Sequence, residues 1–202
     1  MEDSAREAPA GRARLGVFGG TFDPPHIGHL AAAEAARWAL GLDRILFVVA
    51  NRPWQKVLEQ PVSAAADRLA LVRAAVSSLA GFEVCTLEID RGGDSSTAET
   101  LGALAEDGPE LFLIVGSDLA DSLDTWRRPE VIRSLATVAV VARLGADGSG
   151  VPPPGWRWVP VEGPGIEVSS THVRRWLAEG RPLGSVLSQP VAAEIERRGL
   201  YR

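Results

Sequence analysis

Short apolar runs alternate with longer stretches of helical periodicity from residue 14 to the end of the chain. The runs are rich in β-branched residues and predict strands: LGVF at 15–18, RILFVVA at 44–50, FEVCTLEI at 82–89, LFLIVG at 111–116, TVAVVAR at 137–143 and WRWVPVE at 156–162. Continuous apolar runs separated by helices are typical of a parallel sheet that is covered on both faces. We therefore predict an α/β fold, a Rossmann-like, doubly wound, mostly parallel sheet with helices on both faces.

Helices are predicted between these runs and after the last of them. Ser63 is the expected cap of the second helix, and Ser96 with Glu99 resembles a capping box at the third. The expected helices cover residues 27–40, 63–80 and 96–107, two segments after residue 116, and 169–179 and 190–198. The Gly- and Pro-rich segment 145–156 is predicted to be a loop.

The chain length and the ends of the pattern indicate one domain. At 202 residues with 46% hydrophobic content, the chain can bury one sizeable core. Residues 1–12 are small and charged and lack apolar periodicity, so we predict a disordered N-terminal extension followed by a single domain at 13–202. No segment has the apolar length of a signal peptide core or a membrane span, which favours a cytoplasmic protein without membrane contact.

Charge and cysteine content limit the possible partners. The formal net charge of −5 gives no overall attraction to nucleic acid, so a phosphate-bearing ligand needs a local cluster of positive groups. Cys85, the single cysteine, excludes an internal disulfide or a cysteine-based metal cage, and its apolar surroundings predict a buried, inert thiol.

The stretch GGTFDPPHIGHL at 19–30 follows the first predicted strand. In doubly wound sheets a ligand binds where such a strand ends, because a glycine-rich turn lets a phosphate approach the backbone and the next helix offers free N–H groups. Gly19, Gly20 and Thr21 occupy that turn. The stretch fits neither the G-x-G-x-x-G fingerprint nor a Walker A loop, so it indicates a different kind of phosphate site.

His26 and His29 are two of only three histidines in the chain. If the helix begins near Pro25, both imidazoles can face one point and donate hydrogen bonds to a phosphoryl group. Two further interpretations stay open. The pair could bind a metal, although His172 is the only other imidazole, or it could simply cap and pack the start of the helix.

A second group of polar residues, in SSTHVRRW at 169–176, predicts an anion site. Ser169, Ser170 and Thr171 supply hydroxyls and helix N-terminal amides, and Arg174 follows one turn later. Together they suit a polyphosphate tail. The same pattern would also fit a Ser/Thr-capped amphipathic helix with a solvated arginine.

Together, GGTFDPPHIGHL and VSSTHVR resemble the two signatures of the nucleotidyltransferase superfamily with the H-x-G-H motif, in the right order. Within it, residues 15–201 are most similar to the bacterial nicotinate-mononucleotide adenylyltransferases. The resemblance implies transfer of the adenylyl group of ATP to nicotinate mononucleotide, with release of pyrophosphate, in NAD biosynthesis. It also implies Mg²⁺ as cofactor, for which the sequence shows no dedicated carboxylate cage.

The resemblance assigns roles to residues of both motifs and to three further places. It implies that His26, His29 and Arg174 are catalytic. The ATP site it implies comprises Gly19, Gly20, Thr21, Phe22, His26, His29, Gly116, Asp118, Ser169, Ser170, Thr171 and Arg174, and the mononucleotide site comprises Lys56, Thr97 and Trp126.

Simpler roles stay open for three of these residues. Lys56 could be a surface lysine, Asp118 a helix cap and Trp126 a packing residue. Of the six tryptophans, Trp38 is expected in the core.

Residues 94–97, Asp-Ser-Ser-Thr, depart from the family pattern, because Ser96 stands where a tyrosine is usual and Asp94 adds a negative charge. Preference for the acid over the amide mononucleotide is therefore open. The chain could also be a superfamily enzyme for another phosphorylated acceptor, such as phosphopantetheine, a phosphoalcohol or a specialised-pathway substrate, or a non-catalytic nucleotide-binding protein. The sequence leaves the oligomeric state unknown.

Overall fold

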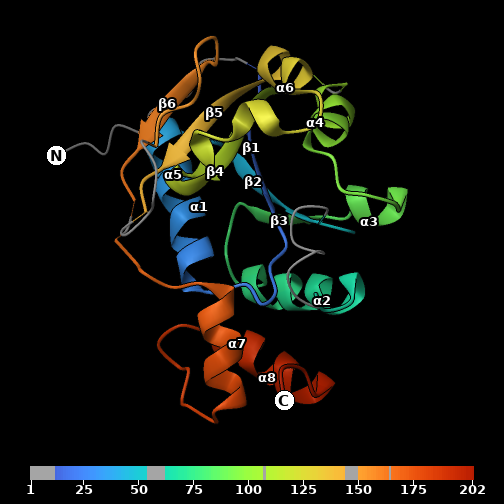
Figure 1. Cartoon of the computed structure of the whole chain (residues 1–202), viewed down its shortest axis with the longest axis vertical. Helices are drawn as coiled ribbons and strands as arrows, with labels where there is room; N and C mark the ends of the chain where they lie inside the picture. Colours follow the sequence, from blue (N-terminus) through green and yellow to red (C-terminus); the bar gives the residue numbers. More distant parts are fainter. Residues whose placement is uncertain (1–11, 54–61, 107, 144–149, 164) are drawn as a thin grey trace, which may run out of the picture.

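Six parallel strands form one sheet in the order β3-β2-β1-β4-β5-β6 in the computed structural model, which describes residues 12–53, 62–106, 108–143, 150–163 and 165–202 (Figure 1). The strands are β1 (Arg14–Gly20), β2 (Arg44–Val49), β3 (Phe82–Cys85), β4 (Glu110–Gly116), β5 (Ala136–Val141) and β6 (Trp158–Val161). Every neighbouring pair runs parallel. The predicted doubly wound fold is confirmed.

Helices cover both faces of this sheet. They are α1 (Ile27–Leu40), α2 (Ala65–Val76), α3 (Leu87–Arg91), α4 (Thr97–Ala105), α5 (Ser117–Ala120), the short 3-10 helix η1 (Leu123–Thr125), α6 (Pro129–Leu135), α7 (Ser170–Ala178) and α8 (Gln189–Arg198). One core cluster joins the sheet to α1, α2, α7 and α8, and a second joins its other face to α4, α5 and α6. In Figure 1, α7 and α8 lie together below the sheet, beside α2.

Strand β2 shows why the apolar runs are continuous. Ile45 and Phe47 belong to the first core cluster, whereas Leu46 and Val48 belong to the second. Both faces of the strand are buried, so each side chain contributes about 1.5–3 kcal/mol of burial free energy. A two-sided core therefore leaves no polar alternation in this strand.

The strand order reverses at β1, which lies between β2 and β4. At such a reversal the connections on either side leave toward opposite faces of the sheet, which opens a crevice beyond the carboxyl ends of the strands. Gly20 ends β1 and Gly116 ends β4. The turns that follow these two glycines therefore meet at the crevice.

The expected strand at 82–89 is wrong in its second half. β3 ends at Cys85, and α3 begins at Leu87. A hydrogen bond of 2.6 Å from the Thr86 hydroxyl to Asp90 closes the first turn of α3. Cys85 is buried, and burial raises the pKa of its thiol, consistent with an inert side chain.

One predicted helix cap is wrong, and a second lacks its predicted side-chain hydrogen bonds. Ala64, not Ser63, precedes α2, and the backbone of Ser63 instead contacts Asp23 and Arg68. Ser96 does precede α4, but its side chain makes no capping hydrogen bond, and Glu99 pairs with Arg91 at 3.2 Å. Tertiary contacts therefore determine the surroundings of Ser63, and the Ser96 hydroxyl stays without a hydrogen-bond partner among the described residues.

Trp38 is not a core residue, since it is 90% exposed. The core face of α1 is made by Ala33 and Ala36, both fully buried. A residue two positions after Ala36 points to the other side of a helix.

Among the described residues, no helix has the length and apolar character that crossing a bilayer requires.

Candidate active site

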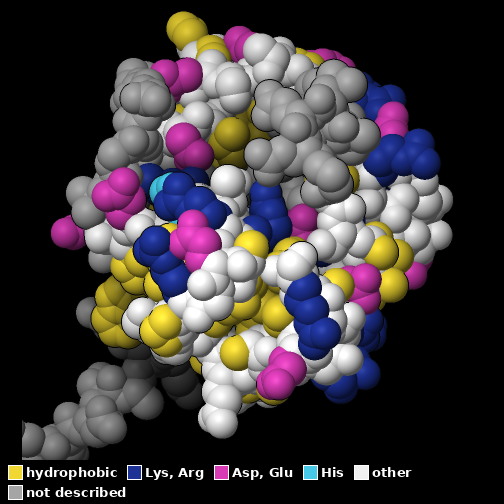
Figure 2. All heavy atoms as spheres, turned by 60° about the horizontal axis from the view of Figure 1, so that its bottom comes forward, with side chains coloured by type: hydrophobic (Ala, Val, Ile, Leu, Met, Phe, Trp, Pro, Cys, Tyr) yellow, Lys and Arg dark blue, Asp and Glu magenta, His cyan; other side chains and the backbone are white. Residues whose placement is uncertain are grey.

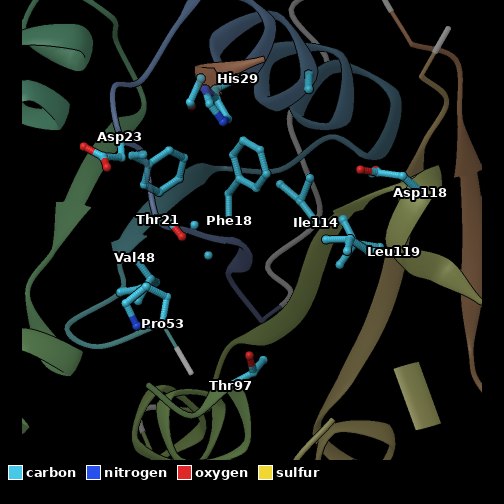
Figure 3. A pocket seen from close by; sticks show the side chains of 18 of the residues that line it. Phe18, Thr21, Asp23, His29, Val48, Pro53, Thr97, Ile114, Asp118 and Leu119 are labelled. Atoms are coloured by element: carbon cyan, nitrogen blue, oxygen red, sulfur yellow. The ribbon is translucent and has the colours of Figure 1, made fainter. Parts of the chain in front are cut away.

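A cavity of about 550 Å³ opens at the carboxyl ends of β1 and β4. In Figure 3, Phe18 and Thr21 lie in its middle, His29 and Thr97 on opposite sides, and Asp118 toward a third. The structure brings every described residue of the predicted site to this cavity, namely Gly19, Gly20, Thr21, Phe22, His26, His29, Thr97, Gly116, Asp118, Trp126, Ser169, Ser170, Thr171 and Arg174. Lys56 lies outside the described residues.

The turn after β1 uses its two glycines differently. A Cβ on Gly20 would lie 2.7 Å from the ring of Phe22, so this glycine is needed for packing. A Cβ on Gly19 would meet no atom within 4 Å, so this glycine leaves open space on the cavity side. Phe22 is 2% exposed and packs edge-on against Phe18 and His29, which fixes the turn to the sheet.

His26 and His29 lie at the start of α1 with their rings stacked, the centroids 3.7 Å apart. The helix begins at Ile27, as predicted, and the backbone N–H of His26 donates to Nδ1 of His29 at 3.1 Å. Because that Nδ1 accepts, the proton of a neutral His29 ring is on Nε2. The pair thus both orders the helix start and presents imidazole to the cavity.

His26 is an uncharged imidazole at neutral pH. It is 6% exposed, and burial, followed by the positive charge of Arg143, lowers its pKa to about 4. A neutral imidazole donates one hydrogen bond to an anionic ligand.

The second motif packs directly on the first. The Ser170 hydroxyl donates to the carbonyl oxygen of Pro24 at 2.8 Å, and Arg174 Nη1 donates to that of Asp23 at 2.8 Å. Gly28 permits this approach, because a Cβ there would lie 2.9 Å from Val168 Cγ1. The N-terminus of α7 is therefore held at the same cavity as the histidines.

Ser169 has the simpler role that the sequence left open. Its hydroxyl accepts the backbone N–H of His172 at 3.2 Å and so caps α7. Thr171 is exposed in the first turn, and Arg174 Nη2 reaches its hydroxyl at 3.5 Å. The capped helix and the proposed anion site are therefore one structure.

Arg143 is a cavity residue that the sequence reasoning missed. It follows β5, donates from Nη1 to Asp118 Oδ2 at 2.9 Å and from Nη2 to the Val168 carbonyl at 3.4 Å. It thereby joins α5 to the segment before α7. Its signal in the sequence is its position, since it closes the predicted strand TVAVVAR at the edge where ligands bind.

The far end of the cavity contains α4 and the segment after η1. Thr97 is the first residue of α4, and half-buried Trp126 directly follows η1. Three buried polar atoms here have no hydrogen-bond partner among the described residues: Ser95 Oγ, Ser96 Oγ and Trp126 Nε1. Unpaired buried polar groups are costly, which makes this end suited to a polar ligand.

Asp94 is paired at the rim of this end. Its carboxylate lies 3.8 Å from Arg52 Nη1 and 3.8 Å from Arg127 Nη1. One carboxylate between two guanidinium groups leaves a net positive charge. The acidic residue that departs from the family pattern therefore does not make the rim negative.

Positive charge is local in this protein. Figure 2, in which the end carrying α7 and α8 is turned forward, shows basic and acidic side chains interspersed with hydrophobic ones. Within the described ranges, no three His, Cys, Asp or Glu side chains are grouped as a metal site. The cavity thus offers hydrogen-bond donors and single arginine side chains to an anionic ligand.

Comparison with known proteins agrees with this geometry. A family model described as cytidylyltransferase-like matches residues 17–176, which include both motifs. The chain belongs to the cytidylyltransferase-like family. It is 43% identical over 191 residues to a probable nicotinate-nucleotide adenylyltransferase of Thermus thermophilus, covering 94% of this chain and all of the relative. A relative of the same name from Roseiflexus sp. is 41% identical, covering 94% and 98%.

Two solved structures extend the comparison to the fold. The nicotinic acid mononucleotide adenylyltransferase of Plasmodium falciparum complexed with NaAD has a TM-score of 0.76 at 14% identity, covering 94% of this chain and 98% of that one. A putative nicotinate-nucleotide adenylyltransferase of Vibrio parahaemolyticus has a TM-score of 0.68 at 18% identity, covering 94% and 96%. These two structures show the same fold, and the family model and the two relatives confirm the family resemblance indicated by the two motifs.

Proposed function

We propose that this member of the cytidylyltransferase-like family transfers the adenylyl group of ATP to nicotinate mononucleotide, giving nicotinate adenine dinucleotide and pyrophosphate in NAD biosynthesis. One observation carries the proposal: a single cavity gathers the two histidines, the second motif and two of the candidate acceptor residues, Thr97 and Trp126. The names of the Thermus and Roseiflexus relatives support it. We further propose that the reaction takes place in the cytoplasm.

The reaction asks the protein for positioning and charge stabilisation. The 5′-phosphate of the mononucleotide attacks the α-phosphorus of ATP in line, a new P–O bond forms, and the bond to pyrophosphate breaks. The nucleophile is already ionised, so no strong general base is needed. His26 and His29 donate N–H groups to the oxygens of the transferring phosphate, where negative charge develops.

The triphosphate tail lies against the second motif in this proposal. Ser170, Thr171 and the first amides of α7 face the β- and γ-phosphates, and Arg174 neutralises part of their charge. Gly19 leaves room for the nucleotide at the end of β1. Asp118 and Gly116 take the ribose, after Asp118 exchanges its hydrogen bond with Arg143 for one to a hydroxyl.

Magnesium fits as part of the substrate. The carboxylates that line the cavity are already bonded: Asp23 to Tyr201, Glu88 to Thr100 and Asp118 to Arg143. Mg²⁺ is commonly held by phosphate oxygens and water with few protein ligands. Bound in this way, it supplies charge neutralisation on the triphosphate.

The nicotinate ring is assigned to the end of the cavity at α4. Trp126 offers a face for stacking, which suits an electron-poor ring. The N-terminus of α4 at Thr97 and the Ser96 hydroxyl suit a carboxylate, and Arg52 and Arg127 make the rim positive. We assign the mononucleotide phosphate to Lys56. These features favour the acid over the amide.

Pyrophosphate release with Mg²⁺ and ATP tests the proposal, with nicotinate mononucleotide and nicotinamide mononucleotide offered in parallel. We expect rapid release with the acid and at least about tenfold lower kcat/KM with the amide. The amide has no negative charge, so it loses the charged contacts that a carboxylate makes with the helix N-terminus and the two arginines. Equal rates would reject the specificity. Release with neither compound, but with another phosphorylated acceptor, would reassign the substrate, and ATP binding without any turnover would favour a nucleotide-binding protein.

A further inference from the structure

Tyr201 is the second-to-last residue of the chain and contacts the first motif. Its hydroxyl donates to Asp23 Oδ1 at 2.6 Å, a bond that spans 178 residues. Asp23 is 4% exposed, and its other carboxylate oxygen accepts the backbone N–H of Ser63 at 3.2 Å. Short hydrogen bonds to an ionised carboxylate are among the stronger ones in proteins. The C-terminus thus fixes the carboxylate of a buried motif residue.

The backbone of the same motif residue holds the candidate triphosphate arginine. Arg174 Nη1 donates to the carbonyl oxygen of Asp23 at 2.8 Å. Pro24 and Thr21 are held as well, by the Ser170 hydroxyl at 2.8 Å and by Arg68 Nη1 at 2.9 Å. Carbonyls of the turn 21–24 thus set the positions of Ser170 and Arg174. A shift of Asp23 would be passed on to both.

We propose that Tyr201 is a positioning residue of the triphosphate site, acting through Asp23 on Arg174. The inference rests on the proposed function for the identity of the ligand, and its geometry is independent of the acceptor. The phenol fixes the side chain of Asp23, the side chain fixes the peptide unit, and the carbonyl aims the guanidinium of Arg174 at the cavity.

Helix α8 is attached to the rest of the protein by contacts other than the Tyr201 hydroxyl. Arg198 Nη1 donates to Asp67 Oδ1 of α2 at 2.6 Å, and Val191 and Ile195 of α8 are buried in the core. Burial, and then the hydrogen bond to Asp23, raise the pKa of Tyr201, so the phenol stays a donor at neutral pH. The arrangement therefore separates the anchoring of α8 from the positioning of the turn.

This separation gives a matched pair of variants. Tyr201→Phe removes one oxygen and keeps the ring, whereas Arg198→Gln removes the bond from α8 to α2 without touching the turn. We would measure the affinity of each protein for α,β-methylene ATP with Mg²⁺ by calorimetry, the KM of ATP and of nicotinate mononucleotide, and the melting temperature. The affinity arm needs no knowledge of the acceptor.

We expect Tyr201→Phe to weaken binding of the ATP analogue and to raise the KM of ATP, each about three- to tenfold. The KM of the mononucleotide should change less than about twofold. Arg198→Gln should lower the melting temperature and leave the ratio of the two KM values unchanged. The double variant Asp23→Asn with Tyr201→Phe should bind the ATP analogue as tightly as Asp23→Asn alone, because both changes act on the same contact.

Two results would overturn the inference. One is an affinity of Tyr201→Phe for the ATP analogue within about 1.5-fold of the wild-type value. The other is a Tyr201→Phe variant in which the KM of ATP and the KM of the mononucleotide change by the same factor, as they would in Arg198→Gln. If wild type binds the analogue but turns over no nicotinate mononucleotide, the proposed acceptor fails while the effect of Tyr201 on the analogue is still measured.

Discussion

The Ser170 hydroxyl donates a 2.8 Å hydrogen bond to the carbonyl oxygen of Pro24, 146 residues earlier in the chain. Pro24 lies in the turn just before the two histidines, and Ser170 begins α7. This bond makes the two motifs one structure before any ligand binds. Preorganised donors cost no reorganisation when charge develops on a phosphate, which is how such a site accelerates displacement at phosphorus.

Replacement of His29 should abolish turnover and preserve the fold. Loss of an N–H donor to the transferring phosphate is expected to lower kcat about 10²–10³-fold in His29→Ala. Nδ1 of His29 also accepts the N–H of His26, so the free energy of unfolding should fall by about 1 kcal/mol. Steady-state kinetics and urea unfolding measure the two effects.

His172→Ala is the control for that variant. His172 is exposed on α7, outside the cavity. We expect a turnover rate close to that of the wild type. A wild-type rate in His29→Ala would remove the role assigned to that imidazole.

Alanine at the two neighbouring glycines should separate binding from stability. Gly19→Ala adds a methyl group where no atom lies within 4 Å, so the unfolding free energy should change by less than about 0.5 kcal/mol, while ATP affinity falls about tenfold. Gly20→Ala forces the ring of Phe22 to move and should cost about 1–3 kcal/mol of stability. Calorimetric titration with ATP and urea unfolding check both; unchanged affinity in Gly19→Ala would place the nucleotide elsewhere.

Trp126→Ala should raise the KM of nicotinate mononucleotide about tenfold and that of ATP less than about twofold, because a stacked ring is worth about 0.5–1.5 kcal/mol beyond its buried area. Trp126→Phe keeps an aromatic face and should recover part of the loss. Trp38→Ala, at a side chain that is 90% exposed, is the control and should change neither KM. Parallel increases in both KM values in Trp126→Ala would argue against stacking.

The ionisation of His26 predicts how stability depends on pH. The folded-state pKa is about 4, below the value of about 6.5 for an unfolded histidine, so the unfolded chain binds the proton more readily. Stability from the neutral ring is complete above about pH 6.5 and is lost as the pH falls toward 4. Between about pH 7.5 and pH 5 the wild type should lose about 2 kcal/mol more unfolding free energy than His26→Asn, measured with urea. Equal losses in both proteins would mean that His26 is readily protonated in the folded state.

Asp94→Asn should sharpen the preference for the acid mononucleotide. Removal of the carboxylate releases Arg52 and Arg127 from this ion pair, and their charge is then available to a nicotinate carboxylate. We expect the KM of the acid to fall about two- to threefold, as for other exposed charges, and the KM of the amide to stay constant. The effect should shrink in high salt. An amide KM that falls equally would show that the rim does not read the carboxylate.

Local pattern was sufficient for most of the elements and failed where tertiary contacts compete. The strand at β2 was predictable because burial on two faces leaves a continuous apolar run, and the helix at 27–40 because burial of one face leaves a helical period. Ser63 and Ser96 fit the rules for helix caps, but a buried carboxylate and the cavity wall determine their environment. Arg143 belonged to no motif, and only the tertiary structure shows its hydrogen bonds to Asp118 and Val168.

The sequence by itself determined the sheet class, the two phosphate motifs and their family, because apolar periodicity and short motifs are local properties of the chain. Only the tertiary structure decided that Arg143 lies close enough to influence the charge of His26, that Asp94 lies between two arginines, and that Tyr201 reaches Asp23. These contacts join segments far apart in the chain, and no local spacing encodes them. The contact of Tyr201 with Asp23 follows from the packing of α8 and the residues after it beside the turn after β1.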